Sequence, residues 1–108
     1  MSVLIVFTSA PDRGVAEKIA RALVEMKLAA CVNILAECTS VYRWQDKIET
    51  AGEVPLMIKT RGAIYDEVEA QIRRLHPYEL PEIVAVTVER GLPDYLDWVS
   101  AATVTEIG

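Results

Sequence analysis

The order of apolar segments limits the fold of this chain more than any other feature of its sequence. Short apolar runs that are typical of strands, and segments with one apolar stripe that are typical of helices, follow one another as strand, helix, strand, strand, helix, strand. Each helix then crosses between two strands of one sheet, and such crossovers are right-handed. We therefore expect both helices to cover the same face of a four-stranded antiparallel sheet.

The limits of these segments follow from the periodicity and from the prolines. His76 precedes Pro77, and a residue before proline avoids the helical region, so the second helix should end at about Leu75. A further helix is expected after the last strand. Strands are expected at 3–8, 30–35, 40–44, 53–60 and 82–89, and helices at 12–27, 63–75 and from about 93. This is the β-α-β-β-α-β order of the ferredoxin-like α+β fold, with an added C-terminal helix.

A long hairpin is expected between the second and third strands. The second strand should be interrupted near Ala36 and Glu37 by a bulge or a bend. The polar segment 45–52 is interpreted as the turn of the hairpin. Pro55 has no N–H to donate, so the return strand is expected to be an edge, or to be bulged, at that residue.

Composition indicates a single globular domain, 1–108. Of its 108 residues 52% are apolar, which is ample for a core. The net charge of −5 and the lack of a basic tract argue against nucleic acid as a partner. No apolar run approaches the roughly 18 residues of a membrane helix, so no membrane partner is expected. With two cysteines and no secretory signal in the opening residues, we expect a cytoplasmic protein with reduced thiols.

The predicted sheet carries apolar side chains on both faces, although helices cover only one. In the last strand Val84 and Val86 alternate with Ile83 and Ala85. The hairpin also leaves long strand edges, which proteins usually pair or cover. We therefore expect the chain to bind copies of itself through its sheet.

Two aromatic residues of the second strand are candidates for that interface. Tyr42 and Trp44 are two positions apart and so share one face of the strand. They could belong to the core, to an interface or to a stacking platform. We favour the interface, because aromatic residues are enriched there.

The chain carries none of the common catalytic motifs. His76 is its only histidine, and no GxGxxG, P-loop, HExxH or CxxC sequence occurs. Cys31 is interpreted as a small apolar strand residue, since free cysteine is among the most buried residue types. We therefore expect the protein not to be an enzyme.

His76 itself has two interpretations. It can end the second helix and interact with the helix dipole, or it can bind a metal or an anion at a cleft. Glu79 and Glu82 could add oxygen ligands, or they could be ordinary surface charges. A site with one imidazole and carboxylates would bind a divalent metal weakly, zinc or copper(II) rather than copper(I). No cofactor other than such a metal is expected.

Five short motifs run through nearly the whole chain. They are Ala29-Ala30-Cys31-Val32-Asn33, Tyr42-Arg43-Trp44 with Lys47-Ile48-Glu49, Ile58-Lys59-Thr60, His76-Pro77-Tyr78-Glu79-x-Pro81-Glu82-Ile83, and Tyr95-Leu96-x-Trp98. Together they resemble the signature of the CutA divalent-cation tolerance family, and the HPYxxPE stretch is the most specific part. The resemblance implies a ferredoxin-like subunit in a cytoplasmic homotrimer joined through sheet edges. It also implies an association with copper and divalent-cation tolerance.

The chain departs from this family at one proposed metal site. Family members with a proposed copper site have a cysteine at the end of the first strand and two adjacent histidines before Pro-Tyr. Here Thr8 and Leu75 take two of those positions, and only His76 remains. The thiolate that copper(I) favours is absent, and so is one imidazole. Tight copper binding through that site is therefore not expected.

Three functions remain open. The first is a homotrimer for metal tolerance or response, with weak metal binding at His76. The second is a small-ligand or anion sensor, because the implied architecture is similar to the trimeric PII signalling proteins, whose ligands bind between subunits. Its expected ligand site consists of Lys59, His76, Tyr78 and Glu82. Lys59 would attract an anion, or it would form a plain ion pair with Glu82. The third is an enzyme with His76 as acid or base, for which no nucleophile can be named.

Overall fold

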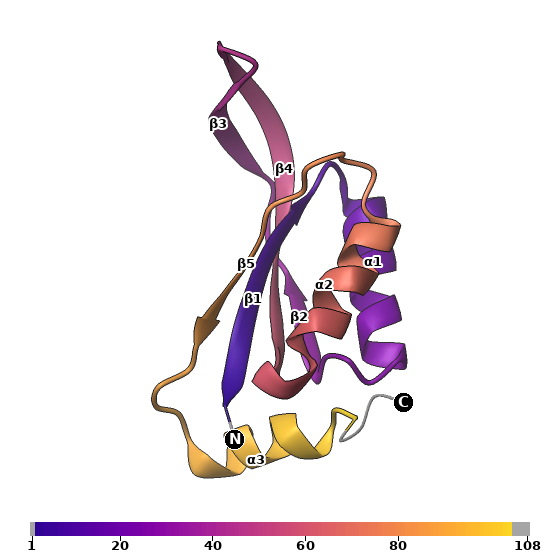
Figure 1. Cartoon of the computed structure of the whole chain (residues 1–108), viewed down its shortest axis with the longest axis vertical. Helices are drawn as coiled ribbons and strands as arrows, with labels where there is room; N and C mark the ends of the chain where they lie inside the picture. The colour runs from indigo at the N-terminus through magenta and orange to yellow at the C-terminus, as the bar shows by residue number, and fades with distance from the viewer. Residues whose placement is uncertain (1, 105–108) are drawn as a thin grey trace.

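The structure is a computed structural model that describes residues 2–104. Within this range the elements are, in chain order, β1 (Val3–Ala10), α1 (Arg13–Glu25), β2 (Cys31–Ile34), β3 (Cys38–Trp44), β4 (Lys47–Arg61), the 3₁₀ turn η1 (Gly62–Ile64), α2 (Tyr65–Leu75), β5 (Ile83–Thr87) and α3 (Pro93–Ala101) (Figure 1). The predicted α+β class, the ferredoxin-like order and the C-terminal helix are confirmed. No helix among residues 2–104 is long and apolar enough to cross a bilayer.

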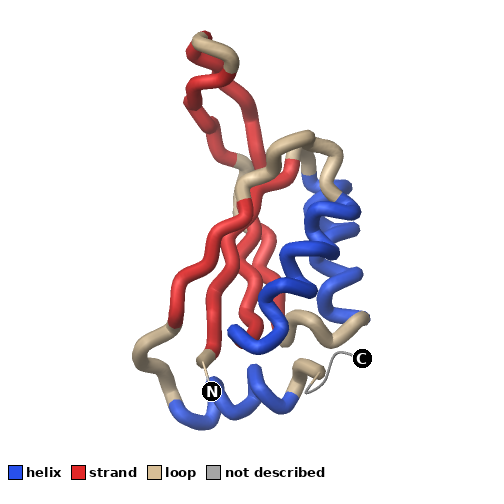
Figure 2. Tube along the Cα trace, in the orientation of Figure 1, coloured by secondary structure: helices blue, strands red, loops and turns tan. Residues whose placement is uncertain are grey.

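The strands form one antiparallel sheet in the order β2-β4-β1-β5, and β3 pairs with the outer part of β4. The central pair, β1 and β4, is in register from Val3 opposite Arg61 to Ala10 opposite Val54. The helices α1 and α2 lie side by side on one face of this sheet (Figure 2). The third helix, α3, lies across the end of the sheet where β1 begins (Figure 1). The prediction that both crossover helices share one face is therefore confirmed.

The core lies between the sheet and these two helices. Alternate residues of β4, from Val54 to Thr60, point toward the helices and are buried, as strand periodicity requires. Helix α1 begins at Asp12, whose carboxylate accepts the N–H of Val15 at 2.8 Å, the usual N-cap bond. The largest fully buried apolar side chains are Val6, Ile19, Leu23, Leu56, Ile58, Val68, Ile72 and Val99.

The hairpin is longer than the sequence predicted. Strand β4 begins at Lys47, and the whole segment from Lys47 to Glu53 pairs with β3. The prediction of a turn over 45–52 is therefore wrong: only Gln45 and Asp46 form it, with φ angles of 51° and 66°. A polar segment can form these strands because the arm, defined as β3 with its partner residues of β4, projects from the globular part (Figure 1). Its side chains then need no core to bury them.

Pro55 stands where the neighbouring strand is interrupted. Strand β2 ends at Ile34 and β3 begins at Cys38, so no ladder residue faces Pro55 on that side. Its carbonyl accepts the N–H of Leu35 at 2.9 Å. The N and C=O of one strand residue point to the same side, so the missing N–H faces the gap. The predicted break of the second strand is confirmed at residues 35–37, between β2 and β3. Strand β4 is a central strand and not an edge, and it has no bulge of its own: it stays in register with β1, where Ser9 faces Pro55, and there it is unpaired only on the side of the break.

The other face of the sheet has no helix layer. We call this surface the open face and define it by five apolar residues that cross-strand pairing places together: Ile5, Phe7, Met57, Val84 and Val86. Val84 and Val86 are 52% and 50% exposed. The predicted two-sided apolar sheet is thus present in the single chain.

Candidate functional site

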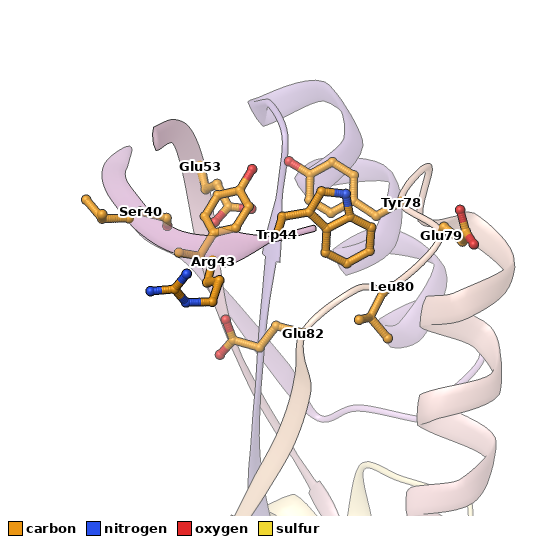
Figure 3. Close-up of a pocket in the computed structure, with 10 residues that line it drawn as sticks. Ser40, Arg43, Trp44, Glu53, Tyr78, Glu79, Leu80 and Glu82 are labelled. Carbon is orange, nitrogen blue, oxygen red and sulfur yellow. The ribbon is translucent and has the colours of Figure 1, made fainter. Parts of the chain in front are cut away.

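A groove of about 640 Å³ opens between the arm and the segment 76–82, which connects α2 to β5 (Figure 3). Its volume lies within the range of small-molecule sites, roughly 300–1,000 Å³. Five of its residues belong to β3, one to β4 and four to the segment 76–82. The lining residues are Ser40, Val41, Tyr42, Arg43, Trp44, Glu53, Tyr78, Glu79, Leu80 and Glu82.

Strand register brings these distant residues together. Tyr42 and Trp44 share one face of β3 by strand alternation. On the other side Ile83 pairs with Thr8, so Glu82 enters the sheet at the end of β1, beside the base of the arm. Figure 3 shows Trp44 reaching from the arm toward the segment that carries Tyr78 and Leu80.

His76 fixes the start of this segment to the sheet. The residue is only 7% exposed, and its Nδ1 accepts the backbone N–H of Tyr78 at 3.1 Å. Nε2 lies 2.6 Å from the carbonyl oxygen of Ser9, so it must carry the proton and donate it. The rings of His76 and Tyr78 also pack with centroids 4.7 Å apart. His76 is therefore buried beside Tyr78, outside the lining of the groove, and it positions Tyr78.

The phenol of Tyr78 lies in a negative environment. Burial is the main cause that raises its pKa above the usual 10.0. The charge of Glu53 and a hydrogen bond with its carboxylate add to the effect, with smaller contributions from Tyr42 and Asp12. Tyr78 is thus held in its neutral form at the mouth of a groove that also holds Glu79 and Glu82.

Lys59 lies elsewhere. It belongs to the inner part of β4, opposite Cys31 of β2, and its amino group donates to the side-chain oxygen of Asn33. It does not line the groove, and no ion pair joins it to Glu82 among the contacts of residues 2–104. Of the four residues expected to form a ligand site, the structure brings Tyr78 and Glu82 together and places His76 behind them. It separates Lys59 from them.

Comparison with known proteins identifies the family. The model of the "CutA1 divalent ion tolerance protein" family matches residues 4–102. The chain belongs to this family. Protein CutA of Mus musculus is 46% identical over 94% of this chain and 58% of its own length, so the chain spans only part of that relative. The divalent-cation tolerance protein CutA of Thermus thermophilus is 42% identical over 92% of this chain and 96% of its own length.

Solved structures of the family share the fold closely. The Thermus thermophilus protein aligns with a TM-score of 0.93 and 41% identity, covering 94% of this chain and 99% of that one. CutA1 from Oryza sativa aligns with a TM-score of 0.95 and 32% identity, covering 98% and 97%. The predicted membership of the CutA family is therefore confirmed, together with its ferredoxin-like fold.

The residues of this family member do not fit a tight metal site in the single chain. Both ring nitrogens of His76 are occupied by backbone groups, so a metal ion would have to displace one of these bonds. Thr8 offers a hydroxyl where a thiolate was required, and it faces the core with 2% exposure. No group of three His, Cys, Asp or Glu side chains able to hold a metal occurs in the described part of the chain. Metal binding by His76 stays a prediction, and this geometry is unfavourable to it.

Sequence reasoning missed that the two candidate sets share one site. Tyr42 and Trp44 were expected at an interface, and Tyr78 and Glu82 at a ligand site, yet all four line the groove. Glu53 was not singled out at all. Its place follows from the long hairpin, since Glu53 pairs with Cys38 at the base of the arm. A strand limit at Lys47 would have placed Glu53 within the hairpin instead of at the start of the return strand.

Proposed function

We propose that this chain is a self-assembling binding protein, and not an enzyme, which acts as a homotrimer in the response to divalent cations. Membership of the divalent ion tolerance family supports the link to metal response. The observation that carries the assembly is the open face, where half-exposed Val84 and Val86 lie beside Phe7 and Met57.

Physical reasons favour assembly over a free chain. Full burial of one valine side chain contributes about 1.5–3 kcal/mol relative to exposure, and a half-exposed one retains part of that. The arm adds two apolar side chains with high exposure, Val41 at 67% and Ile48 at 70%. Strand β3 pairs with β4 alone among the described strands, which leaves its outer edge available to a second chain.

The metal response need not run through a tight site at His76. Because its nitrogens already bond to Ser9 and Tyr78, we expect any zinc or copper(II) binding to be weak. Calorimetry on the wild type and on His76→Ala tests this, with loss of tight binding in the variant as the contrary result. We keep the cytoplasm as the expected location, although relatives carry the names "chloroplastic" in Arabidopsis thaliana and "Periplasmic" in Archaeoglobus fulgidus.

A second candidate function is that of a small-ligand sensor similar to PII. The groove favours it, because it is of ligand size and joins a projecting arm to the rim of the sheet. A ligand there would touch both β3 and the segment 76–82. In the proposed trimer we expect this site to lie between subunits.

Native mass spectrometry tests both candidates at once. We expect a mass three times the 12.0 kDa of one chain. Spectra with and without zinc, copper and small organic ligands report bound mass on the same assembly. A 12.0 kDa monomer at micromolar concentration would contradict the proposed function.

A further inference from the structure

We propose that the groove binds a small organic cation, a molecule with an ammonium group on an apolar body. This inference rests on the proposed function as a binding protein, and it names the chemical class of the ligand. The ligand is opposite in charge to the anion that Lys59 would have attracted in one of the two interpretations of the sequence; in the other, Lys59 formed an ion pair with Glu82.

The first argument is the charge of the lining. Three carboxylates, those of Glu53, Glu79 and Glu82, line the groove against the single guanidinium of Arg43. Arg43 forms no ion pair with any of them among the contacts of residues 2–104, so the three carboxylates outnumber the one guanidinium in the lining. Lys59, the cation expected there, is bonded to Asn33 on another part of the sheet. A concave surface lined by one sign of charge attracts ligands of the opposite sign.

The second argument is the aromatic lining. Tyr42, Trp44 and Tyr78 are 44%, 41% and 38% exposed, so their rings are accessible from the groove. Aromatic faces attract organic cations, and Trp and Tyr provide the stronger of these interactions. Burial, with a smaller contribution from the charge of Glu53, raises the pKa of Tyr78, so its phenol stays neutral beside the carboxylates.

The third argument separates an organic cation from a metal ion. No three acidic, histidine or cysteine side chains converge on one point within the described residues. The carboxylates are instead spread around a space of about 640 Å³. Such a lining fits a ligand whose charged end meets one carboxylate while its apolar body covers the aromatic rings and Leu80.

The experiment uses three probes that share a phenyl body and differ in charge. They are phenethylamine, 2-phenylethanol and 3-phenylpropionate, titrated into the full-length assembly at low salt while ¹H–¹⁵N spectra are recorded. The indole N–H of Trp44, assigned with Trp44→Phe, reports on the groove. The indole N–H of Trp98 on α3 serves as the reference outside it.

We expect the amine to bind about fivefold or more tightly than the alcohol, and the carboxylate to bind most weakly. Glu53→Gln with Glu82→Gln should remove most of that preference. The matched control is Glu17→Gln with Glu25→Gln, the same two changes at exposed residues of α1, which should leave the preference unchanged. Added salt should weaken the amine alone.

Several results would overturn the inference. They are equal binding of the three probes, tighter binding of the carboxylate, no shift at Trp44 with any probe, or an amine preference that survives the double variant. The mass of the same sample, measured by sedimentation, decides the proposed assembly separately. Tight anion binding by a trimer would reject the cation and keep the sensor, whereas a monomer would reject the proposed assembly whichever probe binds.

Discussion

At the scale of single residues, two buried threonines in similar positions differ in whether their hydroxyl groups form a hydrogen bond. Thr8 of β1 and Thr60 of β4 both face the core and are 2% and 0% exposed. The hydroxyl of Thr60 donates to the carbonyl oxygen of Leu28 at 2.6 Å. The hydroxyl of Thr8 has no partner among residues 2–104. The same substitution should therefore act in opposite directions at the two sites.

We expect Thr8→Val to leave stability unchanged or to raise it by up to about 1 kcal/mol, because the buried hydroxyl makes no bond. Thr60→Val should lower the free energy of unfolding by about 1–2 kcal/mol, since it also leaves the Leu28 carbonyl unpaired. Denaturant midpoints of the two variants measure this. A loss at Thr8 equal to that at Thr60 would mean that its hydroxyl has a partner in the working protein.

The ionisation of Tyr78 gives a second prediction at this scale. Glu53→Gln removes a charge that favours the neutral phenol, so the pKa of Tyr78 should fall toward 10.0. Because the folded state raises this pKa, the associated stability is present below pH 10 and is lost as the phenol ionises above it. Ultraviolet titration of both proteins, each with its Tyr78→Phe variant subtracted, measures the shift. An unchanged pKa would show that burial alone sets it.

At the scale of elements, the turn of the arm carries a conformational cost. Gln45 and Asp46 both have positive φ in a two-residue hairpin loop, a geometry in which Asn-Gly is the preferred pair. We expect Gln45→Asn with Asp46→Gly to stabilise the arm by about 1 kcal/mol, because a positive φ costs conformational free energy in residues other than glycine, and least of all in asparagine. Slower amide exchange in β3, by about fivefold, is the measure. Gln45→Ala with Asp46→Ala keeps the cost and should bring no slowing.

The same hairpin shows what the sequence could and could not predict. Segments with a core face, such as β1 and α2, were predicted within two residues at each end. Burial of one face spaces the apolar residues periodically, and this period is visible in the sequence. Residues 45–52 have no core face, so their polar composition predicted a turn although they pair with β3. The strand break was predictable, because Pro55 removes a donor at a fixed position.

Only one side of the groove, the segment 76–82, could be predicted from the sequence. Tyr78 and Glu82 could be selected, since their segment is stiffened by Pro77 and Pro81 and follows the only histidine. Their meeting with Trp44 depends on the length of β4 and on two strand registers, which no local pattern in the sequence specifies. Lys59 was assigned to the groove because its place along β4 could not be related to the position of the segment 76–82.

At the scale of the whole molecule, we propose different roles for two surfaces, assembly for the open face and ligand binding for the groove. The helices cover one face of the sheet, and the open face presents five apolar residues to whatever lies beside it. The groove lies at the opposite end of the sheet from α3, where the arm leaves the domain (Figure 1). A trimer formed through the open face would hold the arms in fixed positions, so assembly and ligand binding would be coupled.

The open face provides the decisive test of assembly. Val84→Glu with Val86→Glu changes two side chains that are half exposed in the single chain, so the fold itself should change in stability by little. In an apolar interface, by contrast, an unpaired buried carboxylate costs several kcal/mol. We therefore expect the variant to sediment as a folded 12.0 kDa monomer, with the circular dichroism of the wild type.

The control for this variant is Val24→Glu, the same substitution at a residue of α1 that is 44% exposed on the helix layer. It adds one carboxylate, against two in the double variant, at a similarly exposed site away from the open face, so it should leave the mass at three chains. If Val24→Glu dissociates the protein as well, the helix layer must form part of the contact. If the double variant keeps three chains together, the open face is not the interface, and the exposed strand edges of the arm become the surface through which the chains join.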